Sequence, residues 1–376
     1  MGIYIATFVS SSLFLYFSSR VKSKRIRSLF AIIALLIPAI LAGLRASTIG
    51  TDVRVYVVFY YEKALNSSSF IDYFSDLVSS FLSEPGYHLL NYVLSRVFKD
   101  YHWGLFFYQL ISLILIYLGL KRCERLFQTP VWLGMMLYYF LLFNNSLNIM
   151  RQCMAVGFVF YGATYMFEKR YKRYVLFTVI ALLFHTSSII SFVMLPMYMI
   201  LQQGKSISQR KQIRQGCIFM LTFFILLIVG SQIITLLVNM GVIRAYYLEY
   251  LSGGRFRGSK SSIPYILVAG HLFLTFILIC CSKYINGRHG ENLFFIMSSA
   301  IITISTYSIV FVQYIDRLGY FFIPLQAAAL ANTYNCFAKK SKILYFSLLV
   351  LMTFGLWYYS IVLKGSHQTV PYEFFF

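Results

Sequence analysis

Residues 174–201 read YVLFTVIALLFHTSSIISFVMLPMYMIL, an apolar run that is interrupted in its middle by the polar sequence His185, Thr186, Ser187 and Ser188. A transmembrane helix needs roughly 20 apolar residues. The run is therefore either one tilted span or two short half-helices that meet at the polar residues. The choice decides the topology of the chain, because every loop after residue 201 changes sides with it.

The distribution of basic residues favours the helical hairpin, because membrane proteins concentrate Lys and Arg in their cytoplasmic loops. A hairpin puts six basic loops on one side, at 18–28, 121–130, 168–173, 203–215, 283–291 and 338–342. That side then carries 21 basic and three acidic residues, and the other side carries 12 basic and nine acidic residues. A single span would invert every loop from 203–215 onward. We therefore predict a hairpin whose tip carries His185 to the outer face.

The composition predicts an all-α polytopic integral membrane protein. Of the 376 residues, 59% are hydrophobic and 12% are charged, whereas soluble domains are about 45–50% apolar and about 25% charged. This composition excludes a soluble enzyme, a disulfide scaffold and a nucleic-acid-binding domain. We therefore attribute the net charge of +21 to basic residues in cytoplasmic loops, and we expect no nucleic acid partner. About ten full spans are expected near 2–17, 28–44, 103–120, 131–148, 151–167, 216–239, 263–281, 292–313, 317–336 and 343–363.

The remaining segments complete one transmembrane domain over residues 1–376, with outer segments at 45–102 and 240–262. Within the first of these, residues 84–98 have the apolar spacing of an amphipathic helix, which we expect to lie in the membrane interface. The apolar stretch from Ile3 to Phe17 precedes the basic run SRVKSKR. That order favours an uncleaved first span with its N-terminus outside, and the hairpin topology then places the C-terminus on the same outer side.

Polar residues gather at the predicted outer ends of the spans, where ionisable groups are costly and indicate function. The candidates are Arg45, Asp52, Tyr56, Glu84, Tyr87, Arg151, Gln152, His185, Asp316 and Arg317. Ordinary structural explanations exist as well: arginines extend to lipid headgroups, Asp52 forms a turn or caps a helix, and His185 caps the hairpin.

Taken together, these residue types suit an anionic headgroup and acid–base chemistry. Arginine binds phosphate oxygens in a bidentate manner, and histidine and carboxylates transfer protons. The sequence has no Walker motif and no DxD-like pair. We therefore expect no cofactor and no metal ion.

Five motifs in order resemble the EpsG/Wzy-type family of bacterial polysaccharide repeat-unit polymerases. They are Arg45 with GTDVRVYVVFY, then EPGYHLL, MRQCMA, ALLFHTSSII and PYEFF. The resemblance implies a metal-independent glycosyltransferase of GT-C-like architecture in the bacterial inner membrane. Its substrates would be undecaprenyl-diphosphate-linked oligosaccharides, as donor and acceptor, which it joins on the periplasmic face into O-antigen, capsule or exopolysaccharide. The family's motif residues map onto Arg45, Gly50, Asp52, Tyr56, Glu84, Gly86, Tyr87, Arg151, Gln152 and His185, with Arg317 as an addition.

The mechanism expected from these residues assigns catalysis to His185, Asp52 and Glu84, with His185 or Asp52 as the base. Arg151 and Arg317, with Arg45, would hold the lipid diphosphates. An O-antigen ligase and a flippase or other transporter remain alternatives. A membrane acyltransferase is disfavoured because His185 lacks an HxxxD partner. A chain-length regulator remains open as a further partner.

Overall fold

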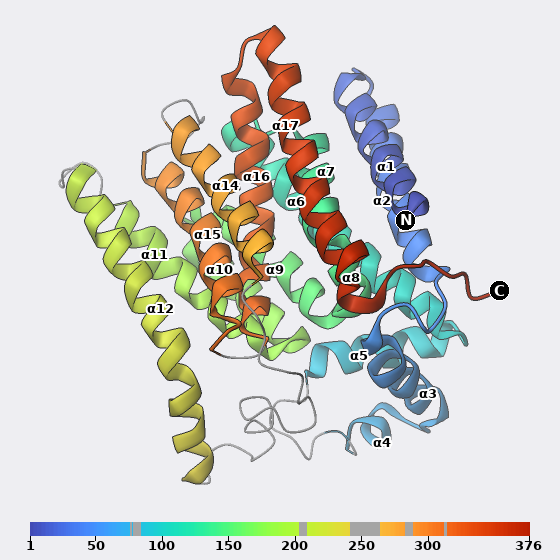
Figure 1. The fold of residues 1–376 in the computed structure, drawn as a ribbon. Coiled ribbons are helices and arrows are strands. Elements are labelled where there is room, and N and C mark those ends of the chain that lie inside the picture. Colours follow the sequence, from blue (N-terminus) through green and yellow to red (C-terminus); the bar gives the residue numbers. More distant parts are fainter. Residues whose placement is uncertain (76, 78–83, 203–208, 241–263, 283–288, 312–313) are drawn as a thin grey trace. The chain divides into compact units, whose positions relative to one another are not determined.

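A computed structural model describes residues 1–75, 77, 84–202, 209–240, 264–282, 289–311 and 314–376 (Figure 1). These residues form helices joined by short turns, which confirms the predicted all-α class. Their isolated β-bridge, between Arg45 and Phe374, belongs to no strand. The predicted outer segment 240–262 lies outside the described residues except for Met240. The chain divides into two compact units, 1–192 with 327–376 and 193–326, and each is described by itself; the single-domain prediction stays a prediction.

The first unit contains both chain ends. Its helices before the hairpin tip are α1 (Gly2–Arg20), α2 (Lys24–Gly43), η1 (Val53–Val58), α3 (Phe59–Asn66), α4 (Phe70–Ser75), α5 (Pro85–Val97), α6 (Tyr101–Phe127), α7 (Val131–Tyr138), η2 (Tyr139–Phe143), α8 (Asn144–Asn148), α9 (Met150–Met166) and α10 (Tyr171–Phe184). After the tip follow η3 (Thr186–Val193), most of α16 (Ile323–Thr333), η5 (Tyr334–Cys336), α17 (Lys339–Trp357), η6 (Tyr358–Leu363) and η7 (Ser366–Gln368).

The second unit is built from α11 (Met194–Leu201), α12 (Gln209–Asn239), α14 (Tyr265–Cys281), α15 (His289–Ser308) and η4 (Ile315–Phe322). Helix α15 packs against α14 and η4. An apolar hollow of about 440 Å³ lies among α12, α14 and α15.

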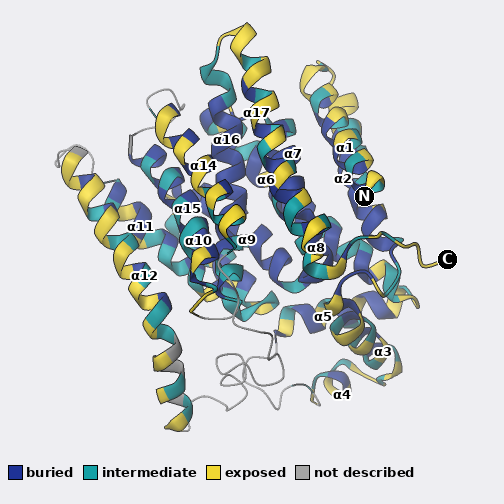
Figure 2. Cartoon of the chain, in the orientation of Figure 1, coloured by how far each residue is buried: buried dark blue, intermediate teal, exposed yellow. Residues whose placement is uncertain are grey.

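Helix α6 lies at the centre of the first unit and packs against both α2 and α9. Close approach to α9 depends on small residues, as in other membrane helix pairs. A Cβ atom on Gly119 would collide with the ring of Phe160, and one on Gly157 would come within 3.0 Å of Leu115 Cβ. In Figure 2 most of α7 and α9 and much of α6 are coloured as buried.

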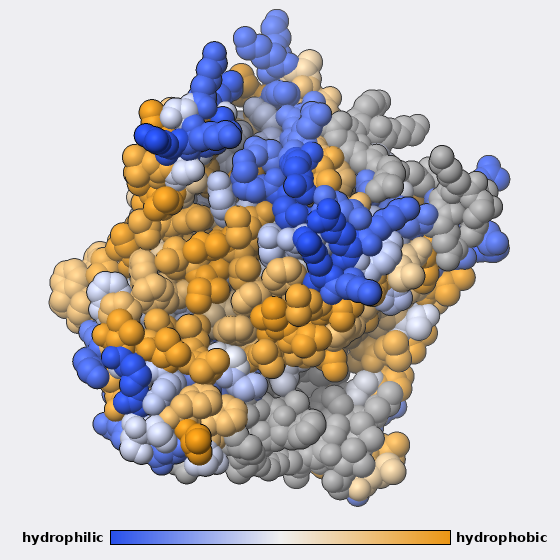
Figure 3. All heavy atoms as spheres, turned by 180° about the vertical axis from the view of Figure 1, so that it is seen from behind, coloured by the Kyte–Doolittle hydropathy of each residue, from blue (hydrophilic) through white to orange (hydrophobic). Residues whose placement is uncertain are grey.

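Five helices of the described chain are long and apolar enough to cross a membrane: Gly2–Arg20, Lys24–Gly43, Tyr101–Phe127, Arg210–Gly230 and Lys339–Leu363. Apolar side chains also make up much of the exposed surface on the face drawn in Figure 3. These observations support a multi-pass membrane protein. The number of ten spans stays a prediction.

Helix α5 is turned so that its apolar side points away from the protein. Leu89, Val93 and Val97 are at least half exposed, whereas Asn91 and Ser95 are fully buried. A helix with this orientation needs an apolar surrounding for its exposed stripe, which fits the interfacial position predicted for residues 84–98.

The chain doubles back at His185, as the predicted hairpin requires. His185 ends α10 with an extended backbone, φ −159° and ψ 124°. The hydroxyl of Tyr174 then donates a hydrogen bond to the carbonyl of Ser191, 17 residues further along. In an uninterrupted helix these residues would be about 25 Å apart. Residues 174–201 are therefore not one continuous helix, and His185 lies at the tip.

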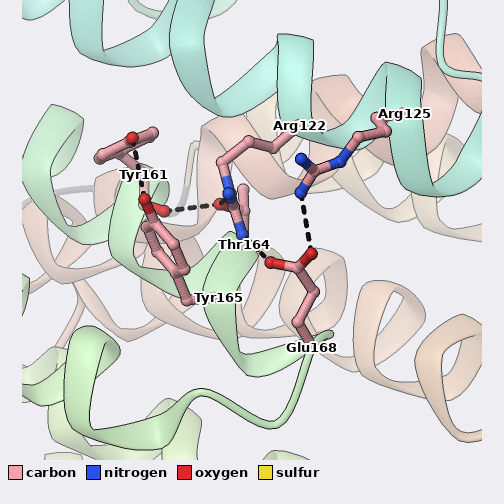
Figure 4. A network of polar contacts seen from close by, with 6 residues as sticks. All are labelled: Arg122, Arg125, Tyr161, Thr164, Tyr165 and Glu168. Carbon is pink, nitrogen blue, oxygen red and sulfur yellow. Dashed lines mark hydrogen bonds and ion pairs between the residues drawn. The ribbon is translucent and has the colours of Figure 1, made fainter.

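A charged network fastens α6 to the end of α9 (Figure 4). Both Arg122 and Arg125 pair with the carboxylate of Glu168, the Arg125 contact being 2.8 Å long. Arg122 also donates to Thr164 Oγ1 at 2.8 Å and lies 3.6 Å above the ring of Tyr165. Arg122, Arg125 and Glu168 belong to the segments 121–130 and 168–173, which the basic-residue pattern assigns to the cytoplasm.

Replacing Glu168 with Gln removes the charge that two arginines share, so we expect E168Q to lower the free energy of unfolding by about 1–3 kcal/mol. Thermal unfolding of the purified protein in detergent measures the change. The control is E124Q, which breaks the more exposed Lys121–Glu124 pair within α6 and should cost less than about 1 kcal/mol. Equal losses in both variants would contradict the assignment of Glu168 as a structural anchor.

Candidate functional site

A buried ion pair between Glu84 and Arg151 forms the centre of the candidate site. The Arg151 Nη1 donates to the Glu84 carboxylate, and the two side chains are 19% and 8% exposed. Arg151 is the second residue of α9. Glu84 immediately precedes Pro85, which opens α5 in the position that suits proline best. The pair therefore joins the first turns of two helices that are far apart in sequence.

The backbone conformation at Glu84 directs its side chain toward Arg151. Glu84 adopts a left-handed conformation, φ 49° and ψ 60°, which is uncommon for a residue other than glycine and costs free energy. Two residues later, Gly86 lies against Leu183 near the end of α10, where a Cβ atom would come within 2.9 Å of Leu183 Cβ. The absence of a side chain at Gly86 thus allows α5 to begin directly beside the hairpin tip.

His185 faces the same carboxylate. Its Nε2 lies 3.9 Å from Glu84 Oε1, while its Nδ1 accepts the backbone N–H of Ser187 at 3.2 Å. A backbone N–H can only donate, so Nδ1 must be unprotonated. In the neutral imidazole the proton is then on Nε2, the nitrogen that faces Glu84.

Two tyrosines line the guanidinium of Arg151. Its central carbon lies 3.9 Å from the ring centroid of Tyr56 and 5.5 Å from that of Tyr87. Cation–π contacts of this kind are attractive and orient the flat guanidinium. Tyr56 belongs to η1, a π-helical turn, and Tyr87 to α5.

Burial raises the pKa of Glu84 above that of an ordinary glutamate, against the opposing effects of Arg151 and of a backbone hydrogen bond from Thr186. The negative charge of Asp52 raises it further. Burial also raises the pKa of Tyr87 to about 12 and lowers that of His88 to about 4. The site therefore holds a carboxyl group whose proton affinity is increased, the property that acid–base catalysis near neutral pH needs.

Asp52 is brought to the edge of this cluster by the loop that precedes η1. Its backbone N–H donates to Asn148 Oδ1 at 2.8 Å, and the hydroxyl of Thr51 donates to the same oxygen at 3.1 Å. Gly50 precedes them with φ +91°, and a Cβ atom there would lie 3.0 Å from the carbonyl of Leu147. Glycine is required because the loop is both left-handed and pressed against α8.

Arg45 is placed differently from the other predicted residues. Its side chain is fully buried, and it donates to the carbonyls of Ala42 at 2.7 Å and Leu147 at 2.9 Å. A further contact reaches Met150 Sδ at 3.1 Å. The structure therefore puts Arg45 beneath the corner between α8 and α9, where no part of it is exposed to a ligand.

The remaining predicted residues are Gln152, in the first unit, and Asp316 and Arg317, in the second. Gln152 is buried beside Arg151 on α9. Asp316 and Arg317 belong to the second unit, in η4, where Tyr320 donates to Asp316 at 3.2 Å and Arg317 lies 4.6 Å from the ring centroid of Tyr314. Their role in substrate binding stays a prediction.

Several groups that support the cluster were not among the predicted site residues. Asn148 holds the Asp52 loop, and Tyr108 donates to Asn91 behind Tyr87. Tyr73 and His88 are joined by a further hydrogen bond of 3.1 Å. Asn148 ends the polar run NNSLN, residues 144–148, and nothing in that run shows which amide faces the Asp52 loop.

In a comparison with models of known protein families, residues 28–374 match the model of the EpsG family. The chain belongs to the EpsG family. This confirms the resemblance drawn from the five motifs, and it associates the chain with polysaccharide polymerisation. No curated protein and no solved structure matches the chain.

A methyl group at Gly86 should disturb the site. In G86A the added Cβ meets Leu183, including its backbone carbonyl at 3.0 Å, so α5 must move away from α10. We expect polymer formation to fall at least about tenfold and stability to fall by about 1–3 kcal/mol. Polymer length on gels and thermal unfolding report the two effects.

The control for this substitution is G355A in α17, where a Cβ atom would meet nothing within 4 Å. It should leave polymer formation unchanged. Normal polymer from G86A would show that the close approach of α5 and α10 is not needed.

Proposed function

We propose that this chain is an inner-membrane polymerase that joins undecaprenyl-diphosphate-linked oligosaccharide units into a long polysaccharide on the periplasmic face. The observation that carries the proposal is the convergence of Glu84, Arg151 and His185 in one partly buried cluster of an EpsG-family chain. Both termini of the chain are then periplasmic, and the basic loops are cytoplasmic.

The proposed reaction is a glycosyl transfer between two lipid-linked units. A hydroxyl at the non-reducing end of the acceptor loses its proton and attacks the anomeric carbon of the donor glycan. The bond between that carbon and the diphosphate oxygen breaks, and undecaprenyl diphosphate leaves with the bonding electron pair. The step needs a base for the hydroxyl proton and positive charge for the leaving diphosphate.

We assign the base to Glu84. Its burial increases its affinity for a proton, and the neutral form of His185 directs an N–H, not a lone pair, toward it. His185 then orients the carboxylate, and Asp52 contributes negative charge nearby. This assignment replaces the expectation from the sequence, which had His185 or Asp52 as the base.

We assign the binding of the leaving diphosphate to Arg151. A guanidinium carries five N–H donors in a planar fork, so the bond from Nη1 to Glu84 leaves the group able to bind phosphate oxygens as well. The ring of Tyr56 beneath it fixes the plane of the fork. Arg45, being fully buried on backbone carbonyls, supports the α8–α9 corner that presents Arg151.

Arg151 variants test the proposal through glycan length. Cells that carry R151A should show a single repeat unit in place of a ladder, because the leaving group loses its positive charge. R151K should fail too, since an ammonium group cannot bind as a fork. The control is R54A, at an exposed arginine two residues after Asp52, which should keep the ladder.

The same gels separate the alternatives. Complete loss of the glycan in cells lacking the chain would point to a ligase or a flippase, whereas a single remaining unit supports polymerisation. An unchanged ladder in R151A would overturn the role of Arg151.

The pH dependence of the rate tests Glu84. A base must be unprotonated, so the initial polymerisation rate of the purified protein should fall as the pH drops through the pKa of Glu84, which lies above that of ordinary glutamate. D52N removes a negative neighbour and lowers that pKa, so the pH at which its rate reaches half of its own maximum should lie below that of the wild type. E84Q should be inactive at every pH, and a rate near that of the wild type in E84Q would refute the assignment.

A further inference from the structure

The last residues of the chain, 366–376, run across the first unit and contact the segment that carries Arg45 and Asp52. We name them the C-terminal strap. Ala46 N–H donates to the carbonyl of Glu373 at 2.9 Å, and Phe375 N–H donates to the carbonyl of Leu44 at 3.1 Å. Gly50 N–H donates to the carbonyl of Gln368, also at 3.1 Å. The strap thus binds both ends of the loop that leads to Asp52.

The strap is itself fixed in the core at Thr369, which is fully buried. Tyr4 in α1 donates to its carbonyl at 2.6 Å, and Asn144 in α8 donates to its Oγ1 at 2.9 Å. Trp357 in α17 donates to Asn144 Oδ1 at 2.7 Å. Side chains from three helices therefore determine the position of the strap, so the groups that it presents to the Asp52 loop are held in place.

One side chain of the strap reaches the amide that holds Asp52. His367 Nδ1 lies 3.1 Å from Asn148 Nδ2. The other end of this amide, Oδ1, already accepts the backbone N–H of Asp52 and the hydroxyl of Thr51. Because a backbone N–H only donates, the amide orientation is determined. Nδ2 must donate, and His367 Nδ1 must accept.

We propose that His367 and Asn148 are positioning residues for the reaction, and that the strap, through them, sets the place of Asp52 beside Glu84 and Arg151. The proposal rests on the proposed function. Asn148 suits this role because it ends α8 three residues before Arg151, so its amide joins the strap, the Asp52 loop and the helix corner that carries the arginine.

The role of His367 Nδ1 as a hydrogen-bond acceptor can be tested with substitutions that keep the backbone conformation. His367 has φ 66°, a conformation that glycine and asparagine adopt most readily. H367G keeps this backbone and removes the acceptor, whereas H367N places a carbonyl oxygen at the same number of bonds from Cβ as Nδ1. We expect H367G to lose at least about tenfold in polymerisation rate and H367N to stay within about twofold of the wild type.

Thermal unfolding of both variants separates positioning from folding. Similar unfolding temperatures with different rates support the proposal, because a purely structural role would change both together. A rate in H367G equal to that of the wild type, or no recovery in H367N, would overturn it. Failure of the proposed function is distinguishable, since the wild-type chain would then polymerise no units.

N148D provides a second test if H367G does not fold. The aspartate keeps the acceptor for Asp52 N–H but sets an oxygen against His367 Nδ1, a contact that is favourable only when the histidine is protonated. The rate of N148D at neutral pH should therefore fall at least about tenfold, as in H367G. A rate in N148D equal to that of the wild type would contradict the contact.

Discussion

The Glu84–Arg151 ion pair is the interaction on which the arrangement of the first unit depends. Removing two charges from water is costly, and the cost is offset only when both partners are well placed and further bonded. Here the hairpin tip, the start of α5 and the ring of Tyr56 all provide such partners. The left-handed backbone at Glu84 and the missing side chain at Gly86 are both explained by the need to bring this carboxylate to that arginine.

Much of the site could be predicted from the sequence because charged residues are rare in this chain. With 12% charged residues, each ionisable group at the end of a span carries information, and Glu84, Arg151 and His185 do meet. The reversal at His185 was also predictable, since basic loops on both sides of 174–201 require an even number of crossings. Apolar runs located the long helices because a transmembrane helix needs about 20 apolar residues.

Other features depend on contacts that no local pattern reveals. Arg45 has the same side chain as Arg151, but it bonds to the carbonyls of Ala42 and Leu147. Leu147 is 102 residues away in sequence, so no local pattern could distinguish the buried arginine from the one paired with Glu84. The link between His367 and Asn148 joins residues more than 200 positions apart. The tautomer of His185 depends on one backbone N–H, that of Ser187.

The length of α10 has a consequence for the lipid around it. Its 14 residues extend about 21 Å, whereas the hydrocarbon core of a bilayer is about 30 Å thick. A half-helix that starts at one surface therefore ends well inside the membrane, and the bilayer responds to such a short apolar length by thinning. Lipid headgroups and water therefore lie closer to His185 and Glu84 than they would beside a helix of full length.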